Sequence, residues 1–229
     1  MISKKRRKII AMKKVVIIHT SFISVDTLNG LFKEILPTIQ VHNIVDDSLL
    51  PEIMQNGCVT DSVKKRYLAY AKQAEEEIHA DLIFNQCSSA GPAADYAQTL
   101  IHTPILKIDQ AMAEKAVEIG NKIAVIATIG TTLNPSISLI KKVAEEKKSN
   151  AVITPFLQED AYEALFLYHN AALQNKILID KLWEIQNDYD VIVLAQGSMV
   201  TLLDDLKGYP LPILTSPRLG VERAKEMLH

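Results

Sequence analysis

The sequence predicts an α/β protein with two pseudo-symmetric lobes, each a mostly parallel sheet flanked by helices. Three observations support this fold class: short apolar runs rich in β-branched residues recur along the chain, segments of helical periodicity separate most of them, and the pattern repeats in the second half. Uninterrupted apolar runs are typical of strands buried on both faces, as in parallel sheets covered by helices on each side.

The strand-like and helix-like segments alternate from one end of the chain to the other. Segments with the composition of strands lie at 14–19, 39–45, 81–86, 104–108, 122–127, 151–156, 190–195 and 211–215. Segments with helical periodicity include 60–79, 109–119, 136–148, 160–187 and 217–228. A further helix is expected over 92–99, because Pro92 suits the first turn of a helix.

The strand segments of the second half repeat those of the first. Thr20 of KVVIIHTS aligns with Thr128 of KIAVIATI at an offset of 108 positions. Asp81 of ADLIFNQCSSAG aligns with Asp190 of YDVIVLAQGSMV at an offset of 109, and TPILKIDQAMAEKA aligns with LPILTSPRLGVERA at 108. Three matches in one order and at nearly one offset indicate a tandem duplication of one α/β unit.

A duplicated α/β unit has consequences for the domain organisation and for the place of the site. We expect residues 12–108 plus 209–229 to form the first lobe and residues 109–208 to form the second. Ligands bind outside the carboxyl ends of the strands in such sheets, so the active site is expected in the cleft between the lobes. Residues 1–11 are interpreted as a basic N-terminal tail, either solvated or upstream of the true start, because Met12 begins a conventional-looking strand.

Composition excludes several classes of function. The chain is 48% hydrophobic and 23% charged, and its net charge of −2 offers no field for nucleic acid or an anionic membrane. No apolar segment reaches the roughly 18 residues of a membrane span, so a cytoplasmic protein without a membrane partner is expected. The oligomeric state is left open, with a homodimer as one possibility.

No sequence motif calls for a cofactor or a metal. Two cysteines, Cys58 and Cys87, make neither a disulfide framework nor a CxxC motif, so reduced thiols are expected. The chain contains no glycine-rich phosphate loop of the GxGxxG or GxxxxGK[ST] type, and no His/Asp/Glu cluster has metal-ligand spacing. We therefore predict that the protein uses no cofactor and no metal.

The segment FNQCSSAG at 84–91 is the strongest candidate for chemistry. It ends a buried apolar run with Cys87, where the carboxyl end of a parallel strand is expected to reach the surface. Ser88 and Ser89 offer hydroxyl donors that favour a thiolate, and a helix is expected to begin just beyond them. Cys87 is therefore predicted to act as an acid/base thiol, whereas Cys58 is expected in a surface turn. With the second offset, Cys87 corresponds to Gln196.

Four segments resemble one family, the aspartate/glutamate/hydantoin racemase superfamily. They are IIHTS at 17–21, FNQCSS at 84–89, AVIATIGTT at 124–132 and VLAQGSM at 193–199, and the resemblance covers nearly all of 12–229. It implies a cofactor-independent enzyme of two α/β lobes, with a cysteine at the end of one strand in each lobe. One thiolate would remove the proton next to a carboxylate while the other thiol protonates the opposite face. This sequence has Gln196 where the resemblance implies the second cysteine, and an amide has no proton to relay near neutral pH.

Polar residues at the ends of the equivalent strands are candidates for substrate binding. Their hydroxyls, amides and backbone N–H groups are suited to holding a carboxylate. These candidates are Thr20, Ser21, Asn85, Ser88, Ser89, Thr128, Gly130, Thr131, Thr132, Gly197 and Ser198. The alternative for TIGTT is that it caps a helix beginning near Asn134, with Pro135 at its first position. A structural role is favoured for His19, a core or interface role for His169, and a core position for Trp183.

The resemblance and the site residues together predict an isomerase of the amino-acid racemase or epimerase type. It would act at the carbon next to a carboxylate of a small amino acid or related acid, with Cys87 exchanging the proton opposite Gln196. Two alternatives remain open: a single-cysteine carbon–carbon lyase of the decarboxylase kind, and a non-catalytic protein that binds small acids. The sequence does not name the substrate.

Overall fold

The chain forms two four-stranded parallel sheets. A computed structural model describes residues 12–229, and the basic tail predicted over 1–11 lies outside the described residues. The strands are β1 (Lys14–His19), β2 (Gln40–Val45), β3 (Leu82–Asn85), β4 (Ile105–Lys107), β5 (Lys122–Ala127), β6 (Val152–Leu157), β7 (Val191–Leu194) and β8 (Ile213–Thr215). The first sheet has the order β2-β1-β3-β4 and the second the order β6-β5-β7-β8. The predicted fold class is confirmed.

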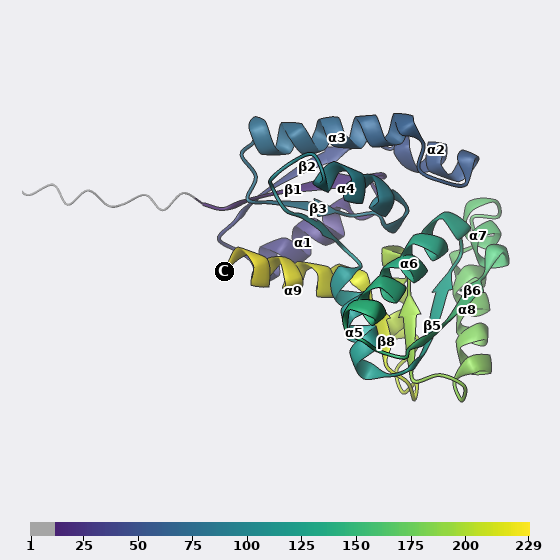
Figure 1. Ribbon diagram of the computed structural model, residues 1–229. Coiled ribbons are helices and arrows are strands. Elements are labelled where there is room, and N and C mark those ends of the chain that lie inside the picture. The colour runs from purple at the N-terminus through teal and green to yellow at the C-terminus, as the bar shows by residue number, and fades with distance from the viewer. Residues whose placement is uncertain (1–11) are drawn as a thin grey trace, which may run out of the picture.

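Helices cover both faces of each sheet (Figure 1). They are α1 (Val25–Ile35), α2 (Leu49–Asn56), α3 (Asp61–Glu76), η1 (Ser88–Ala90), α4 (Gly91–Gln98), α5 (Gln110–Ile119), α6 (Gly130–Glu146), α7 (Glu159–Phe166), α8 (Ala171–Ile185), η2 (Gly197–Asp204) and α9 (Ser216–Leu228), where η marks a 3₁₀ helix. Lobe 1 is the first sheet with its helices, and lobe 2 is the second sheet with its helices.

The two repeats also share an equivalent hydrogen bond at the start of their first strands. Lys14 N at the start of β1 donates to Asp81 Oδ2 at 2.7 Å, and the equivalent Lys122 N at the start of β5 donates to Asp190 Oδ2 at 2.8 Å. These are the two aspartates that align in the sequence. Each anchors the start of the first strand of its sheet to the segment that leads into the third.

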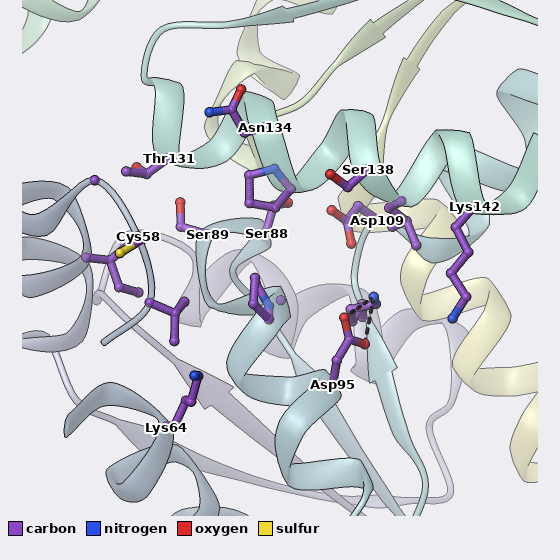
Figure 2. A pocket seen from close by; sticks show the side chains of 18 residues that line it. Cys58, Lys64, Ser88, Ser89, Asp95, Asp109, Thr131, Asn134, Ser138 and Lys142 are labelled. Carbon is purple, nitrogen blue, oxygen red and sulfur yellow. Dashed lines mark hydrogen bonds and ion pairs between the residues drawn. The ribbon is translucent and has the colours of Figure 1, made fainter. Parts of the chain in front are cut away.

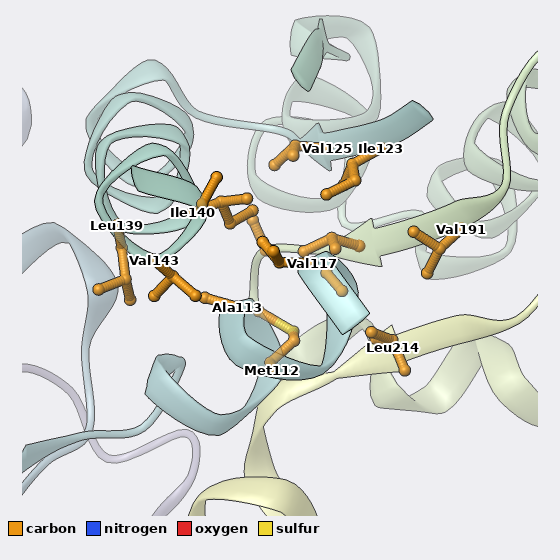
Figure 3. Packing of buried hydrophobic residues seen from close by; sticks show 14 of the residues in the cluster. Met112, Ala113, Val117, Ile123, Val125, Leu139, Ile140, Val143, Val191 and Leu214 are labelled. Carbon is orange, nitrogen blue, oxygen red and sulfur yellow. The ribbon is translucent and has the colours of Figure 1, made fainter. Parts of the chain in front are cut away.

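Alternation along the buried strands supplies two cores in each lobe. In β1, Val16 and Ile18 pack toward α2, α3 and α4, whereas Val15 and Ile17 pack toward α1 and α9. Lobe 2 repeats this arrangement, with α5 and α6 on one face of its sheet and α7, α8 and η2 on the other. Figure 3 shows the first of these lobe 2 cores, where side chains of α5 and α6 meet strands β5 and β7.

The chain passes between the lobes twice, each time directly after a fourth strand. After β4, helix α5 packs on the second sheet, and after β8, helix α9 packs on the first, as predicted for the C-terminal helix. Because β8 pairs with β7, the assignment of 209–215 to lobe 1 was wrong: these residues lead into and form the last strand of the second sheet. Only α9 returns to lobe 1.

Three helix predictions are corrected by the structure. The helix expected over 160–187 is two helices, α7 and α8, separated by a segment in which His169 has φ +50°. Helix α6 starts at Gly130 and contains Pro135 in its interior, so TIGTT begins the helix instead of preceding it. Helices α1 and α2 were not identified, although Leu28 and Phe32 show the spacing of one buried helical face.

The structure also corrects two predicted core positions. Trp183 is 45% exposed on α8, with its ring set edge-on against Tyr209, because this face of the helix is turned to solvent. His169 is exposed in the segment between α7 and α8, so the core role is excluded, and the interface role stays a prediction. Within residues 12–229, no helix is long and apolar enough to cross a membrane.

Candidate functional site

The carboxyl ends of the central strands of both sheets carry the polar residues singled out in the sequence. Thr20 follows β1 and Thr128 follows β5, while Cys87 and Gln196 each stand two residues beyond β3 and β7. Helix α6 of lobe 2 contacts η1 of lobe 1, so these strand ends lie at the boundary between the lobes. The topology therefore brings the predicted residues to one region of the molecule.

Cys87 occupies an extended position just before η1. Its backbone has φ −116° and ψ 120°, and its carbonyl accepts a hydrogen bond from Ala90 N at 3.0 Å, which starts the 3₁₀ turn. The thiol is free and half-buried, packed against the core that faces α2, α3 and α4. Cys87 thus combines a fixed backbone with partial access to solvent.

A buried chain of hydrogen bonds holds the backbone of Cys87 in place. Tyr67 Oη donates to Asn85 Oδ1 at 3.0 Å, and Asn85 Nδ2 donates to the Cys87 carbonyl at 2.9 Å. Burial raises the pKa of Tyr67 well above its ordinary value, with smaller contributions from Cys87 and Asp95, so the phenol remains a donor. The sequence did not point to Tyr67, since an aromatic residue at helical spacing on α3 is typical of any core.

The expectation that Asn85 presents its amide to a ligand was wrong. The side chain is fully buried and both ends of its amide are engaged within lobe 1. Leaving such a buried amide without partners would cost about 1–3 kcal/mol. Its role in the structure is to position Cys87.

Gln196 has the backbone of Cys87 but a different side-chain environment. Its φ of −107° and ψ of 127° are close to those of Cys87, and its carbonyl accepts from Met199 N at 3.0 Å. The side-chain oxygen Oε1 accepts from Thr128 N at 2.6 Å and from Thr128 Oγ1 at 3.0 Å. In lobe 1, Gln86 Oε1 lies 3.5 Å from Thr20 N, so the comparable contact comes from the residue before Cys87.

A hydroxyl pair joins the lobes beside the candidate thiol. Ser89 Oγ on η1 lies 2.9 Å from Thr132 Oγ1 on α6, and both side chains are buried. Of the other predicted binding residues, Thr20 and Thr128 are buried, Ser21, Gly130 and Gly197 are half-buried, and Ser198 is exposed. The pair is a direct polar contact between the two repeats.

A cavity of about 470 Å³ opens next to this contact (Figure 2). Lobe 1 lines it with residues of α2, the α2–α3 loop, α3, η1, α4 and β4, and lobe 2 lines it with α6. Asp109, where the chain crosses from β4 to α5, also lies on the wall. Three predicted residues, Ser88, Ser89 and Thr131, are on its wall. Cys87 and Gln196 are not among the lining residues, so the thiol flanks the cavity through the serines that follow it.

Both signs of charge meet in this cavity. The cationic side chains on its wall are Lys64, Lys107 and Lys142, and the carboxyls are Asp95 and Asp109. Lys107 Nζ is paired with Asp95, at 2.9 Å from Oδ1 and 3.1 Å from Oδ2. The sequence analysis missed all five, because isolated charged residues far apart in the chain carry no common pattern.

Asp109 differs from the other charged residues of the cavity because it is 3% exposed. Burial raises the pKa of its carboxyl, against the opposing effects of the Ser88 hydroxyl and Lys107. Among the residues that the structure describes, Asp109 Oδ1 has no hydrogen-bond partner. A group of this kind is poised either to keep its proton or to accept a donor from a ligand.

The remaining candidates take structural positions. His19 is buried, with Nε2 lying 2.8 Å from Asn43 Oδ1, and burial lowers its pKa, in keeping with the structural role expected for it. Cys58 is exposed in the α2–α3 loop and also lines the cavity. Within the described part of the chain, no group of three or more His, Cys, Asp or Glu side chains could hold a metal ion.

The match to a family model decides the relationship of this chain. The model described as Asp/Glu/Hydantoin racemase matches residues 15–224. The chain belongs to this family. The predicted resemblance is confirmed, and the family match spans both repeats.

Solved structures of racemases share the fold of this family member. Glutamate racemase RacE1 from Bacillus anthracis superposes with a TM-score of 0.70 at 18% identity, covering 94% of this chain and 81% of the other. Aspartate racemase from Picrophilus torridus gives 0.70 at 14% identity, covering 94% of each chain. Allantoin racemase from Klebsiella pneumoniae gives 0.68 at 15%, covering 94% of this chain and 87% of the other. The comparison with curated protein sequences found no match.

Proposed function

We propose that this protein is a cofactor-independent enzyme of the racemase or epimerase type. It exchanges a proton at the carbon next to a carboxylate in a small amino acid or related acid, and Cys87 is the group that exchanges it. The family match and the racemase folds support this class of reaction. The observation that carries the proposal is the position of Cys87: a free, half-buried thiol beyond a central strand, beside the interlobe contact.

The proposed chemistry follows from what a thiol can do. The Cys87 thiolate removes the proton next to the carboxylate, and the electron pair of the broken C–H bond spreads into the carboxylate as an enediolate. In this proposal, Ser88, Ser89 and the hydroxyls at the start of α6 hold that carboxylate. Return of a proton from the Cys87 thiol to carbon completes an exchange on one face. Inversion requires a proton from a second donor at the other face, such as a water molecule, because the Gln196 amide supplies none.

A carbon–carbon lyase is the second candidate, and Gln196 is the observation that favours it. An amide held by Thr128 supplies no acid at the position equivalent to Cys87. In a lyase, the C–C bond to a carboxylate breaks, carbon dioxide leaves, and the Cys87 thiol gives its proton to the enediolate. One acid then suffices.

Isotope exchange separates these possibilities. The wild-type protein would be incubated in deuterium oxide with each enantiomer of aspartate and glutamate, and with a monosubstituted malonate. NMR would detect deuterium at the carbon, and chiral chromatography would detect inversion. We expect deuterium incorporation from at least one amino acid. Decarboxylation of the malonate alone would favour the lyase, and no reaction with any of these acids would leave binding as the function.

Matched changes at the two thiols show which one carries the exchange. Cys87→Ser should reduce it by at least about 10²-fold, because a hydroxyl is a much weaker acid than a thiol and positioned acid/base groups contribute about 10²–10⁴-fold. Cys58→Ser makes the same chemical change at the exposed thiol. Loss of exchange in Cys58→Ser alone would move the chemistry away from Cys87.

A further inference from the structure

The carboxyl of Asp109 is the feature of the cavity that the proposed proton transfer does not explain. It stands at the point where the chain leaves β4 for α5, and its side chain lies on the cavity wall (Figure 2). A carboxyl that is 3% exposed is costly unless hydrogen bonds or a cation compensate for its burial. The hydrogen bonds and cations around Asp109 therefore determine whether its burial is compensated.

The usual structural role of an aspartate at this position is not realised. Asp109 is the N-cap residue of α5, where aspartate is favoured because its carboxylate can accept from the first backbone N–H groups. Its side chain makes no such capping hydrogen bond. The residue 108 positions later, which aligns with it in the repeat, is Pro217 in the first turn of α9. The duplicated fold thus does not require a carboxyl here.

None of the three cavity lysines forms a salt bridge with Asp109, although Lys107 partly opposes the effect of burial on its pKa. Lys107 is the cation nearest in the chain, and its ammonium group is already paired with both oxygens of Asp95. Lys64 lies 3.4 Å from Asp61, and Lys142 lies 3.9 Å from Glu146. Asp109 forms no salt bridge with any residue that the structure describes, and its Oδ1 accepts no hydrogen bond there.

A second unpartnered polar atom lies on the same cavity. Thr131 Oγ1 on α6 is buried and has no hydrogen-bond partner within the described residues. The cavity thus offers an acceptor at Asp109, a hydroxyl at Thr131 that can donate, and lysines on both lobes. A ligand that carries an ammonium group and a carboxylate satisfies all of these, whereas a simple dianion leaves the Asp109 acceptor opposed by like charge.

We propose that Asp109 binds the α-ammonium group of an amino-acid substrate, with the unpartnered Thr131 hydroxyl donating to its carboxylate. This inference rests on the proposed function and sharpens it: the substrate is an α-amino acid and not a malonate or another acid without an amino group. The reacting carbon is bonded to the ammonium nitrogen, so Asp109 would also fix the position of that carbon in the cavity that the η1 serines line.

Binding of matched acids tests this inference without requiring turnover. Isothermal titration calorimetry at pH 7 would compare L- and D-aspartate with succinate, and L- and D-glutamate with glutarate, which differ only by the ammonium group. A charge-assisted hydrogen bond contributes about 1.5–3 kcal/mol, so one amino acid should bind at least about tenfold more tightly than its partner acid. Asp109→Asn should bring that ratio close to one.

The pH dependence provides a second readout. Ammonium binding favours the ionised form of Asp109, so amino-acid affinity should rise as pH increases through the raised pKa of Asp109 in the wild type and stay flat in Asp109→Asn. The groups that face Asp109 from neighbouring elements are Ser88 of η1, Asp95 of α4 and Lys107 of β4. Above the pH at which both of their own carboxyls are ionised, succinate and glutarate should lack this rise.

Asp180 provides the control for the charge change at Asp109. Asp180→Asn makes the same charge change on the exposed face of α8 and should keep the wild-type preference. Equal binding of amino acid and partner acid by the wild type, or no binding of any probe, overturns the inference. So does a preference that survives in Asp109→Asn or disappears in Asp95→Asn instead. Deuterium exchange tests the proposed function separately. If Asp109→Asn keeps both the exchange and the binding preference for amino acids, the assignment of Asp109 is wrong and the proposed function stands.

Discussion

The two lobes have the same backbone conformation at the ends of two equivalent strands, but the side chains there differ. Cys87 and Gln196 share an extended conformation, and each carbonyl accepts the hydrogen bond that opens a 3₁₀ helix. In lobe 1 the thiol is free, and its peptide is held by Asn85. In lobe 2 the amide is held by Thr128. The backbone thus defines two equivalent positions, and the side chains decide that only lobe 1 offers an acid.

Both lobes have a glutamine contact to the backbone N–H that follows the first strand, but the two glutamines are one residue apart in the repeat. In lobe 1, Gln86 lies near the backbone N–H of Thr20, and in lobe 2 Gln196 bonds the equivalent N–H of Thr128. A glutamine at 196 therefore performs in lobe 2 the contact that its neighbour performs in lobe 1. This comparison teaches that both strand ends have a comparable polar contact although only the lobe 1 end has a thiol.

The largest expected effect comes from restoring the equivalence of the two strand ends. Gln196→Cys should increase inversion relative to one-face exchange by about tenfold or more, because a positioned acid/base group contributes on the order of 10²–10⁴-fold and the lost Thr128 contact offsets part of the gain. Chiral chromatography and NMR in deuterium oxide measure the ratio. Gln86→Cys moves a thiol to the neighbouring position and should give no gain, so an equal rise there would contradict the equivalence.

A smaller effect is expected at Gly220 of α9, the helix that returns to lobe 1. A Cβ added at Gly220 would lie 2.7 Å from the Ile108 carbonyl oxygen and 3.0 Å from the Phe84 ring. Gly220→Ala should therefore lower the free energy of unfolding by about 1–3 kcal/mol in urea titrations.

The matched control for Gly220→Ala is another helical glycine of lobe 1. Gly30 in α1 has nothing within 4 Å of an added Cβ, so Gly30→Ala should raise the free energy of unfolding by about 0.5–1 kcal/mol. Equal destabilisation by both substitutions would show that α9 does not approach the first sheet as closely as described.

Asp109 marks a further asymmetry, because its repeat partner is a proline. Burial raises the pKa of Asp109 in the folded state above the ordinary value of 3.8, so the native protein binds more protons than the unfolded chain. Its contribution to stability is present at acid pH and is lost as pH rises through the raised value. Asp109→Asn should flatten this decline and be about 1 kcal/mol more stable at pH 7. Thermal unfolding from pH 4 to pH 8 measures it, and a wild-type profile that rises over this window relative to Asp109→Asn would contradict the sign.

An effect of similar size is expected for the hydroxyl pair between the lobes. A double-mutant cycle of Ser89→Ala and Thr132→Val should give a coupling of about 0.5–1.5 kcal/mol in urea unfolding, as for one neutral buried hydrogen bond. Thr201→Val on exposed η2 provides the comparison, and its effect should add to that of Ser89→Ala without coupling. A cycle that closes to zero would mean that the pair does not join the lobes in solution.

The sequence by itself determined the fold class, the family resemblance and the correspondence of the repeats. Continuous apolar runs such as KVVIIH and KIAVIA require burial on both faces, and the offset of about 108 positions identifies which strands are equivalent. Cys87 could be selected for the same reason: a polar residue directly after a buried strand lies at the carboxyl edge of a parallel sheet. These signals are local in the chain or are repeated in it.

Only the tertiary structure decided what each polar side chain contacts. Asn85 turned out to be committed to Tyr67 and Cys87, and Gln196 to Thr128, because such pairs depend on where distant segments meet. The cavity and its unpartnered Asp109 likewise arise from four or more elements that join across both lobes. Burial is a property of the folded molecule. The sequence around the lone aspartate after β4 therefore does not indicate that its carboxyl is buried and unpartnered.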